Sequence, residues 1–194
     1  IRWSNIDFAE TSRLNLGVKN VVSVQASESS FMSGSDVYSA MTGYNLSDDN
    51  SAPGSNALRN SNPQFAETEN YSLSSNSPAK GSGGPITTAT SSGSGNTIKV
   101  EDAIWFHDGY GLTEGDKILV RTQSGTQRTV ITSVPDDNTI VVRDQLPSWQ
   151  AGAWINFDFG STSIDRGYYP FSFDPPPPPG KNDNYVSFLP ILMK

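Results

Sequence analysis

The sequence has no cysteine, one histidine and no long apolar run among its 194 residues. Without cysteine the chain has no disulfide and no thiol nucleophile, and a lone histidine leaves zinc without its preferred nitrogen and sulfur ligands. No stretch approaches the roughly 20 apolar residues of a membrane span. Basic residues number 13 against 20 acidic ones, and the net charge of −7 argues against nucleic acid as a partner.

Turn-forming residues are plentiful. The chain has 17 glycines and 13 prolines, and 35% of its residues are hydrophobic, which favours a turn-rich all-β protein over a helical one. It begins at Ile1 with no initiating methionine, and we interpret it as a processed piece of a longer secreted precursor.

Residues 1–24 contain short β-favouring runs separated by Asn, Ser and Gly. Short strands with polar corners are typical of solenoid coils, which bury their inner faces against one another. A polar stretch, 27–61, reads as a long excursion from a coil. Within it, Asp48, Asp49 and Asn50 offer oxygens either to a calcium ion or to solvent in a turn. No other cofactor is expected.

Residues 62–84 interrupt regular structure with prolines and a glycine pair. Three motifs stand here, at 62–65 (NPQF), 70–73 (NYSL) and 77–81 (SPAKG). They resemble the segment that closes the last coil in secreted right-handed parallel β-helix proteins of the pectate-lyase-like superfamily. The resemblance implies that a β-helix ends here. Two positions that are acidic in that pattern are occupied here by Asn62 and Lys80, so the resemblance does not imply binding through carboxylates at these positions.

A second module is predicted over 97–171, after a Thr/Ser/Gly-rich linker at 85–96. Alternating strands separated by Gly and Asp/Asn turns predict a small antiparallel barrel or sandwich. The segments 117–121, 129–134 and 139–142 look like an SH3-like β element of surface proteins. The ending at 160–171 is similar to the end of a module that follows the closing segment in some secreted β-helix chains.

The C-terminal tail joins a stiff spacer to an apolar strand. Five prolines in the spacer, 172–184, favour an extended polyproline II conformation. The strand, 185–194, would expose apolar side chains unless it docks on its own domain, on a neighbouring subunit by strand addition, or at an anchoring site. It resembles the C-terminal ending of many secreted bacterial proteins. Its predicted assembly residues are Tyr185, Val186, Phe188, Leu189, Ile191 and Leu192.

Residues suited to catalysis are sparse. His107 lies beside Asp108 in a glycine-rich turn, and no nucleophile elbow is present. Aromatic side chains gather in the second module, where Trp105 and Trp154 follow strand patterns and are predicted core residues. Sugar rings stack on exposed aromatic faces, so the remaining aromatics are the candidates for glycan binding: Tyr110, Trp149, Tyr168 and Tyr169.

Two functional hypotheses remain open. The first is a non-catalytic extracellular or cell-surface structural module that assembles with its own copies, or with other surface proteins, through the tail. The second is a carbohydrate-active protein, either a polysaccharide-binding module or the C-terminal fragment of a β-helix lyase. Polysaccharide is the partner in the second case.

Overall fold

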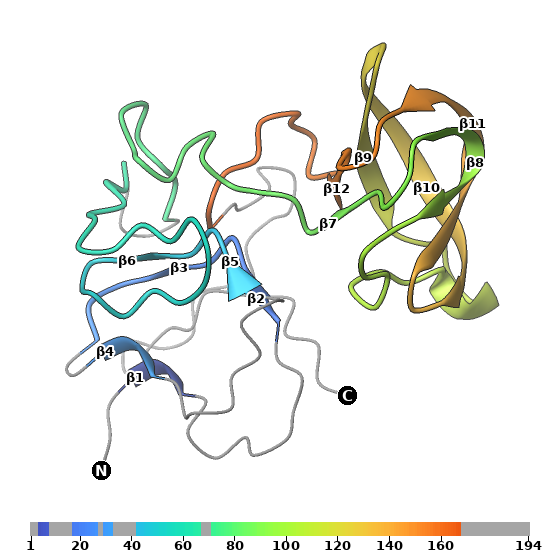
Figure 1. The fold of residues 1–194 in the computed structure, drawn as a ribbon. Coiled ribbons are helices and arrows are strands. Elements are labelled where there is room, and N and C mark those ends of the chain that lie inside the picture. The colour runs from blue at the N-terminus through green and yellow to red at the C-terminus, as the bar shows by residue number, and fades with distance from the viewer. Residues whose placement is uncertain (1–3, 8–16, 27–28, 33–41, 67–70, 168–194) are drawn as a thin grey trace. The chain divides into compact units, whose positions relative to one another are not determined.

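The computed structural model describes residues 4–7, 17–26, 29–32, 42–66 and 71–167, and it divides the chain into two compact units (Figure 1). Unit 1 comprises Ile1–Gly84 and Ser163–Lys194, and unit 2 comprises Pro85–Thr162. The described regular structure is strand throughout, apart from one 3-10 turn, which agrees with the all-β prediction. No helix in the described part of the chain is long and apolar enough to cross a membrane.

In its described residues, unit 1 contains three short parallel sheets of two strands each. In each sheet a strand pairs with one about two dozen residues later, as Ser4 with Ser29, Val18 with Thr42, and Val22 with Leu46. The paired strands are β1 (Ser4–Asp7) with β4 (Ser29–Met32), β2 (Val18–Lys19) with β5 (Thr42–Gly43), and β3 (Val22–Ser23) with β6 (Leu46–Ser47).

We call each run of the chain along this set of parallel pairs a pass: the first contains β2 and β3, and the second contains β5 and β6. A third pass, at 55–58, follows the second after a shorter interval. Ser55 pairs with Gly43, and Leu58 pairs with Leu46. The backbone N–H of Leu58 donates to Asn45 O at 2.8 Å, and that of Leu46 donates to Val21 O at 2.7 Å. The three passes therefore form a continuous ladder of backbone hydrogen bonds.

Each pass turns at an equivalent corner. Asn20, Tyr44 and Asn56 occupy it with φ of 59°, 57° and 54°. Asn tolerates this left-handed region better than most residues, whereas a tyrosine there is unusual. The ring of Tyr44 lies against Gly84, where a Cβ atom would overlap it. The corner therefore depends on a glycine 40 residues further along the chain.

Two apolar side chains from the described part of 62–84 pack against the buried cluster of unit 1. Phe65 and Leu73 form an antiparallel bridge. Both pack against a buried cluster made of Val22, Leu46 and Ala79. Both side chains are partly buried, so each contributes less than the roughly 1.5–3 kcal/mol of a fully buried side chain of this size. The segment that resembles a coil-closing motif thus places its apolar residues over the core of the parallel passes.

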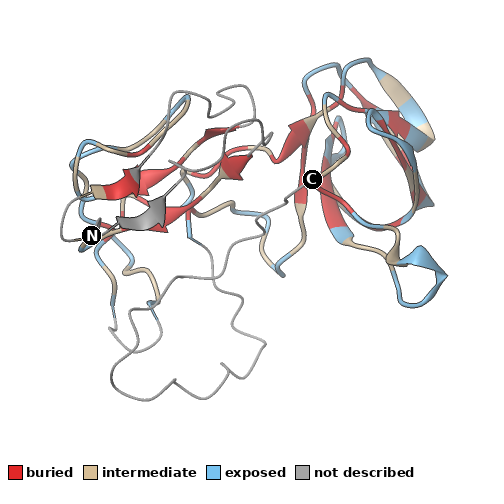
Figure 2. Cartoon of the chain, turned by 90° about the horizontal axis from the view of Figure 1, so that it is seen from below, coloured by how far each residue is buried: buried red, intermediate tan, exposed pale blue. Residues whose placement is uncertain are grey.

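Unit 2 is a six-stranded curled sheet with the order β7-β12-β9-β10-β11-β8 (Figure 1). Its core contains isoleucine and valine side chains that are fully or almost fully buried, such as Ile118, Val120 and Ile140 (Figure 2). An antiparallel bridge between Ala89 and Val100 joins the two edges. The strands are β7 (Thr87–Thr88), β8 (Gly93–Lys99), β9 (Lys117–Thr122), β10 (Gly125–Asp136), β11 (Thr139–Trp149) and β12 (Trp154–Phe157).

Two predicted boundaries differ from the structure. The stretch 85–96 is not a linker, because it contains β7 and the start of β8. Its Ser, Thr and Gly residues have little apolar character, but the sheet supplies backbone partners for them. The second module also ends before 171, because the segment Ser163–Gly167 belongs to unit 1: Gly83 N–H donates to Ile164 O at 2.8 Å, and Gly167 N–H donates to Asn20 O at 2.7 Å.

Candidate functional site

The loop that precedes β9 carries the most exposed aromatic side chain of unit 2. It contains the 3-10 turn η2 (Gly109–Gly111). Asp108 begins the turn, and its Oδ1 accepts the N–H of Tyr110 at 2.9 Å. The carbonyl of Gly109 accepts the N–H groups of Leu112 and Thr113 at 2.9 and 3.2 Å. These local bonds explain why Asp-Gly-Tyr-Gly forms a tight turn here.

The base of this loop is closed by a reciprocal pair. The N–H of His107 donates to Asp116 Oδ2 at 2.7 Å, and the N–H of Asp116 donates to His107 O at 2.9 Å. Gly115 lies so close to β10 that a Cβ atom there would overlap Ile131 O. The ends of the loop are therefore held together and held to the sheet.

Tyr110 and Leu112 are displayed at the tip, 74% and 88% exposed. Tyr110 has φ of 52°, a left-handed conformation that costs a non-glycine residue about 1–2 kcal/mol. Its hydroxyl lies 2.9 Å from His107 Nδ1, and the two rings are 5.7 Å apart. The exposure predicted for Tyr110 is present, and its orientation is set by His107.

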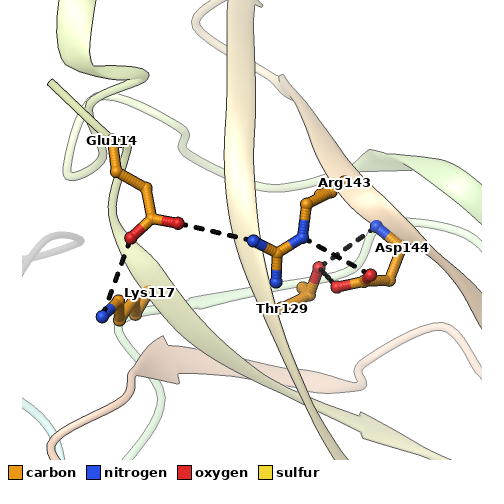
Figure 3. Close-up of polar contacts among 5 residues, drawn as sticks. All are labelled: Glu114, Lys117, Thr129, Arg143 and Asp144. Atoms are coloured by element: carbon orange, nitrogen blue, oxygen red, sulfur yellow. Dashed lines mark hydrogen bonds and ion pairs between the residues drawn. The ribbon is translucent and has the colours of Figure 1, made fainter.

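Charged side chains in and beside the loop form a row of ion pairs (Figure 3). Glu114 lies 3.7 Å from Lys117 and 3.4 Å from Arg143, and all three are more than half exposed. Arg143 also contacts Asp144 at 3.5 Å. A hydrogen bond from Thr129 is the main reason that the pKa of Asp144 lies below its ordinary value. Exposed pairs of this kind contribute at most about 1 kcal/mol each.

The prediction of an exposed Trp149 is wrong. Only 3% of this residue is exposed, and its Nε1 donates to Ser91 O at 3.0 Å. Strand β11 continues through Pro147 to Trp149, which pairs with Gly93 on β8. A Cβ atom on Gly93 would lie 2.8 Å from the indole, so the glycine makes room for the ring. Trp149 is a core residue and offers no face to a sugar.

The two predicted core tryptophans differ in burial. Trp105 is 4% exposed, as predicted. Trp154 is half-buried, and the guanidinium of Arg121 covers its ring at 4.4 Å. The other aromatic candidates, Tyr168 and Tyr169, lie outside the described residues. So do all the predicted assembly residues of 185–194.

The candidate calcium ligands act as acceptors for the backbone of neighbouring passes. Asp48 accepts Gln25 N–H at 2.9 Å, and Asp49 accepts Ser30 N–H at 2.7 Å. Burial alone would raise the pKa of Asp49, but hydrogen bonds from Ser51 and Ser30 lower it below its ordinary value. Asn50 is exposed. In the described ranges, no three His, Cys, Asp or Glu side chains form a group that could hold a metal ion.

Arg166 is a central residue that the sequence did not single out. It is 4% exposed. Its Nη1 donates to the carbonyls of Asn45 and Asn56 at 2.8 Å each, and its Nε donates to Ser82 Oγ at 2.9 Å. Burial lowers the pKa of Arg166 below the ordinary arginine value. The side chain ties the second and third passes to the closing segment, and its partners are far away in sequence.

Comparisons with protein-family models, with curated proteins and with solved structures found no match to this chain.

Proposed function

We propose that this chain is a non-catalytic extracellular structural module that ends a parallel β-helix and connects it to its own copies or to a cell surface through the C-terminal strand. The observation that carries the proposal is the register of unit 1. Three separate parallel sheets pair residues 24 or 25 positions apart, as Val18 with Thr42 and Ser4 with Ser29. A chain that coils with about two dozen residues per turn produces this pattern, and the third pass follows after a shorter turn, since Ser55 pairs with Gly43.

The end of the coil supports the same proposal. A solenoid needs a cap, because its last coil otherwise leaves apolar residues and backbone groups without partners. Here Phe65 and Leu73 cover the apolar core, and Arg166 supplies donors to the carbonyls of Asn45 and Asn56. These side chains stabilise a terminus rather than create a site for chemistry.

Carboxylate side chains, among them the candidate calcium ligands Asp48 and Asp49, hold backbone N–H groups. Asp48 and Asp49 accept N–H groups from neighbouring passes, and Asp116 closes the loop before β9. This use of carboxylates favours the structural role over the alternative of a lyase fragment. The extracellular location rests on the resemblance of 62–81 and of the tail to segments of secreted proteins.

The test is the solution mass of the chain with and without 185–194, measured by sedimentation equilibrium. We expect the intact chain to assemble, because an apolar strand on a stiff spacer gains by pairing with a sheet edge. A matched variant, Phe188→Ser with Ile191→Ser, keeps the tail length and should also fail to assemble. Retention of the same three chains on cells tests the alternative of attachment to a cell surface. Equal masses and equal retention for the intact, substituted and shortened chains would refute the attachment role.

A further inference from the structure

We propose that the tip formed by Tyr110 and Leu112 is a binding site for a chain of N-acetylated amino sugars. This inference goes beyond the structural role of the module and does not depend on the tail. It starts from exposure. In the described residues the large hydrophobic side chains classed as exposed are Tyr71, Tyr110, Leu112 and Phe159, and two of these four stand two positions apart on one turn.

The tip is preorganised. Residues in left-handed conformations persist where the surrounding structure determines them, and such residues concentrate at binding sites. Tyr110 is held by the Asp108 carboxylate through its backbone and by His107 through its hydroxyl. The pair of His107 and Asp116 closes the loop beneath it. Binding at this ring therefore costs the protein little conformational entropy.

The side chains at the tip suit an N-acetylated sugar. The apolar face of a pyranose ring can stack on the exposed ring of Tyr110. Leu112 offers an apolar surface to a methyl group, which an N-acetyl substituent has and glucose lacks. Asp108, whose Oδ1 already bonds the turn, brings carboxylate acceptor capacity for hydroxyl and amide N–H donors.

The charge at the tip selects against acidic polymers. Asp108, Glu114 and Asp116 all lie in or at the end of the loop, and Lys117 is the nearest basic residue in sequence. Lys117 and Arg143 both pair with Glu114, so their charge is partly offset. A polyuronate would bring its carboxylates towards these groups. The charge of the loop therefore favours a neutral ligand over an acidic one.

Titration calorimetry on the full chain tests the proposal with three hexasaccharides, of N-acetylglucosamine, glucose and galacturonate. We expect the N-acetylglucosamine hexamer to bind at least tenfold more tightly than the other two. Tyr110→Gly should weaken its binding tenfold or more, whereas Tyr110→Phe should keep it within about threefold because the ring remains. Leu112→Ser should reduce the preference over the glucose hexamer.

Two controls separate binding from folding. Tyr110→Gly should unfold at the same or a higher urea concentration than the parent, because glycine adopts positive φ without strain. Tyr71→Ala removes another exposed tyrosine and should leave binding unchanged. The proposal is overturned if the N-acetylglucosamine hexamer fails to bind at millimolar concentration, if Tyr110→Gly binds it as well as the parent, or if galacturonate is preferred. These outcomes leave the assembly measurement unaffected, so the two proposals fail separately.

Discussion

At the level of single residues, buried polar side chains hold the passes of unit 1 to one another. Asn45 is fully buried, and its amide donates to Val18 O and Pro53 O at 2.9 and 3.0 Å while its Oδ1 accepts Val21 N–H. This burial also removes Asn45 from consideration as a glycosylation site, although it starts an Asn-Leu-Ser triplet. Arg166 plays a comparable role, with carbonyls in place of a carboxylate partner.

Replacing Arg166 should strongly destabilise the chain. Arg166→Gln shortens the side chain and removes the guanidinium donor from the carbonyls of Asn45 and Asn56, of which Asn45 O keeps the N–H of Leu58, so we expect a loss of about 2–4 kcal/mol in the free energy of unfolding. Urea denaturation measures it. The control is Arg143→Gln, which removes only exposed ion pairs and should change the free energy by less than about 1 kcal/mol. Equal effects of the two substitutions would show that Arg166 does not hold the passes together.

Asp49 should make the stability of unit 1 sensitive to acid. Its folded-state pKa is lowered, so the ionised form stabilises the fold at pH values above the unfolded carboxyl pKa of about 3.9. That contribution is lost as the pH falls from this value through the lower folded-state pKa. Asp49→Asn should therefore show a smaller drop in urea midpoint between pH 6 and pH 3 than the parent does.

A neighbouring substitution provides the comparison for this pH dependence. Asn50→Ser alters an exposed side chain beside Asp49 and should keep the acid sensitivity of the parent. An Asp49→Asn variant with the same pH profile as the parent would assign the acid sensitivity to other carboxyl groups. Asp136 and Asp144 also have lowered pKa values, mainly because of hydrogen bonds from Thr139 and Thr129.

At the level of the element, the pairing of β11 with β8 explains why each of these segments is a strand. Trp149 ends β11, and its indole lies over Gly93 at the start of β8. From the sequence alone, 85–96 is predicted to be a linker and Trp149 is predicted to be exposed. Paired, the glycine supplies space and the tryptophan supplies apolar surface, so both stretches become strand. The pairing of β8 with β11 therefore accounts for the burial of Trp149 and for the strand at the end of 85–96, whereas β7 in the same stretch pairs with β12.

Trp149→Ala should remove about 3–5 kcal/mol from the free energy of unfolding, because it opens a large cavity in the core of unit 2. Trp154→Ala is the matched variant. It should lose only roughly 1–2 kcal/mol, since Trp154 is half-buried and its ring is covered by the guanidinium of Arg121. Chemical denaturation followed by circular dichroism compares them. A Trp149→Ala variant with the same free energy of unfolding as the parent would mean that this ring is not part of the core.

At the level of the whole molecule, unit 2 is an insertion in the chain of unit 1. It occupies Pro85–Thr162, and the segments on either side of it return to one unit. Gly83 N–H donates to Ile164 O, and Gly81 N–H donates to Asp165 Oδ1 at 2.6 Å, so the two ends of the insertion are fixed close together. Insertions whose ends meet are well tolerated, because they add little strain to the host.

Replacing 86–161 by a short Gly/Ser linker should therefore leave unit 1 folded. The amides of Leu46 and Leu58 donate to Val21 O and Asn45 O, and we expect both to keep their protection from hydrogen exchange. Adding Arg166→Gln to the shortened chain should still destabilise it. In the described residues, every side-chain hydrogen bond of Arg166 goes to a residue of unit 1. Loss of amide protection in the shortened chain would show that unit 1 requires the insertion.

The sequence by itself predicted the strand segments at 117–121, 129–134 and 139–142 and the all-β class. Period-two alternation and turn residues such as Gly125 and Asn138 are local, so they act before any tertiary contact forms. The tertiary structure alone decided that 85–96 is strand, that Trp149 is buried, and that Arg166 stabilises the parallel passes. Those outcomes depend on partners 50 or more residues away, as between Trp149 and Gly93 or between Arg166 and Asn45. Burial and hydrogen-bond pairing belong to the contact between distant segments, and no local pattern encodes which segments will meet.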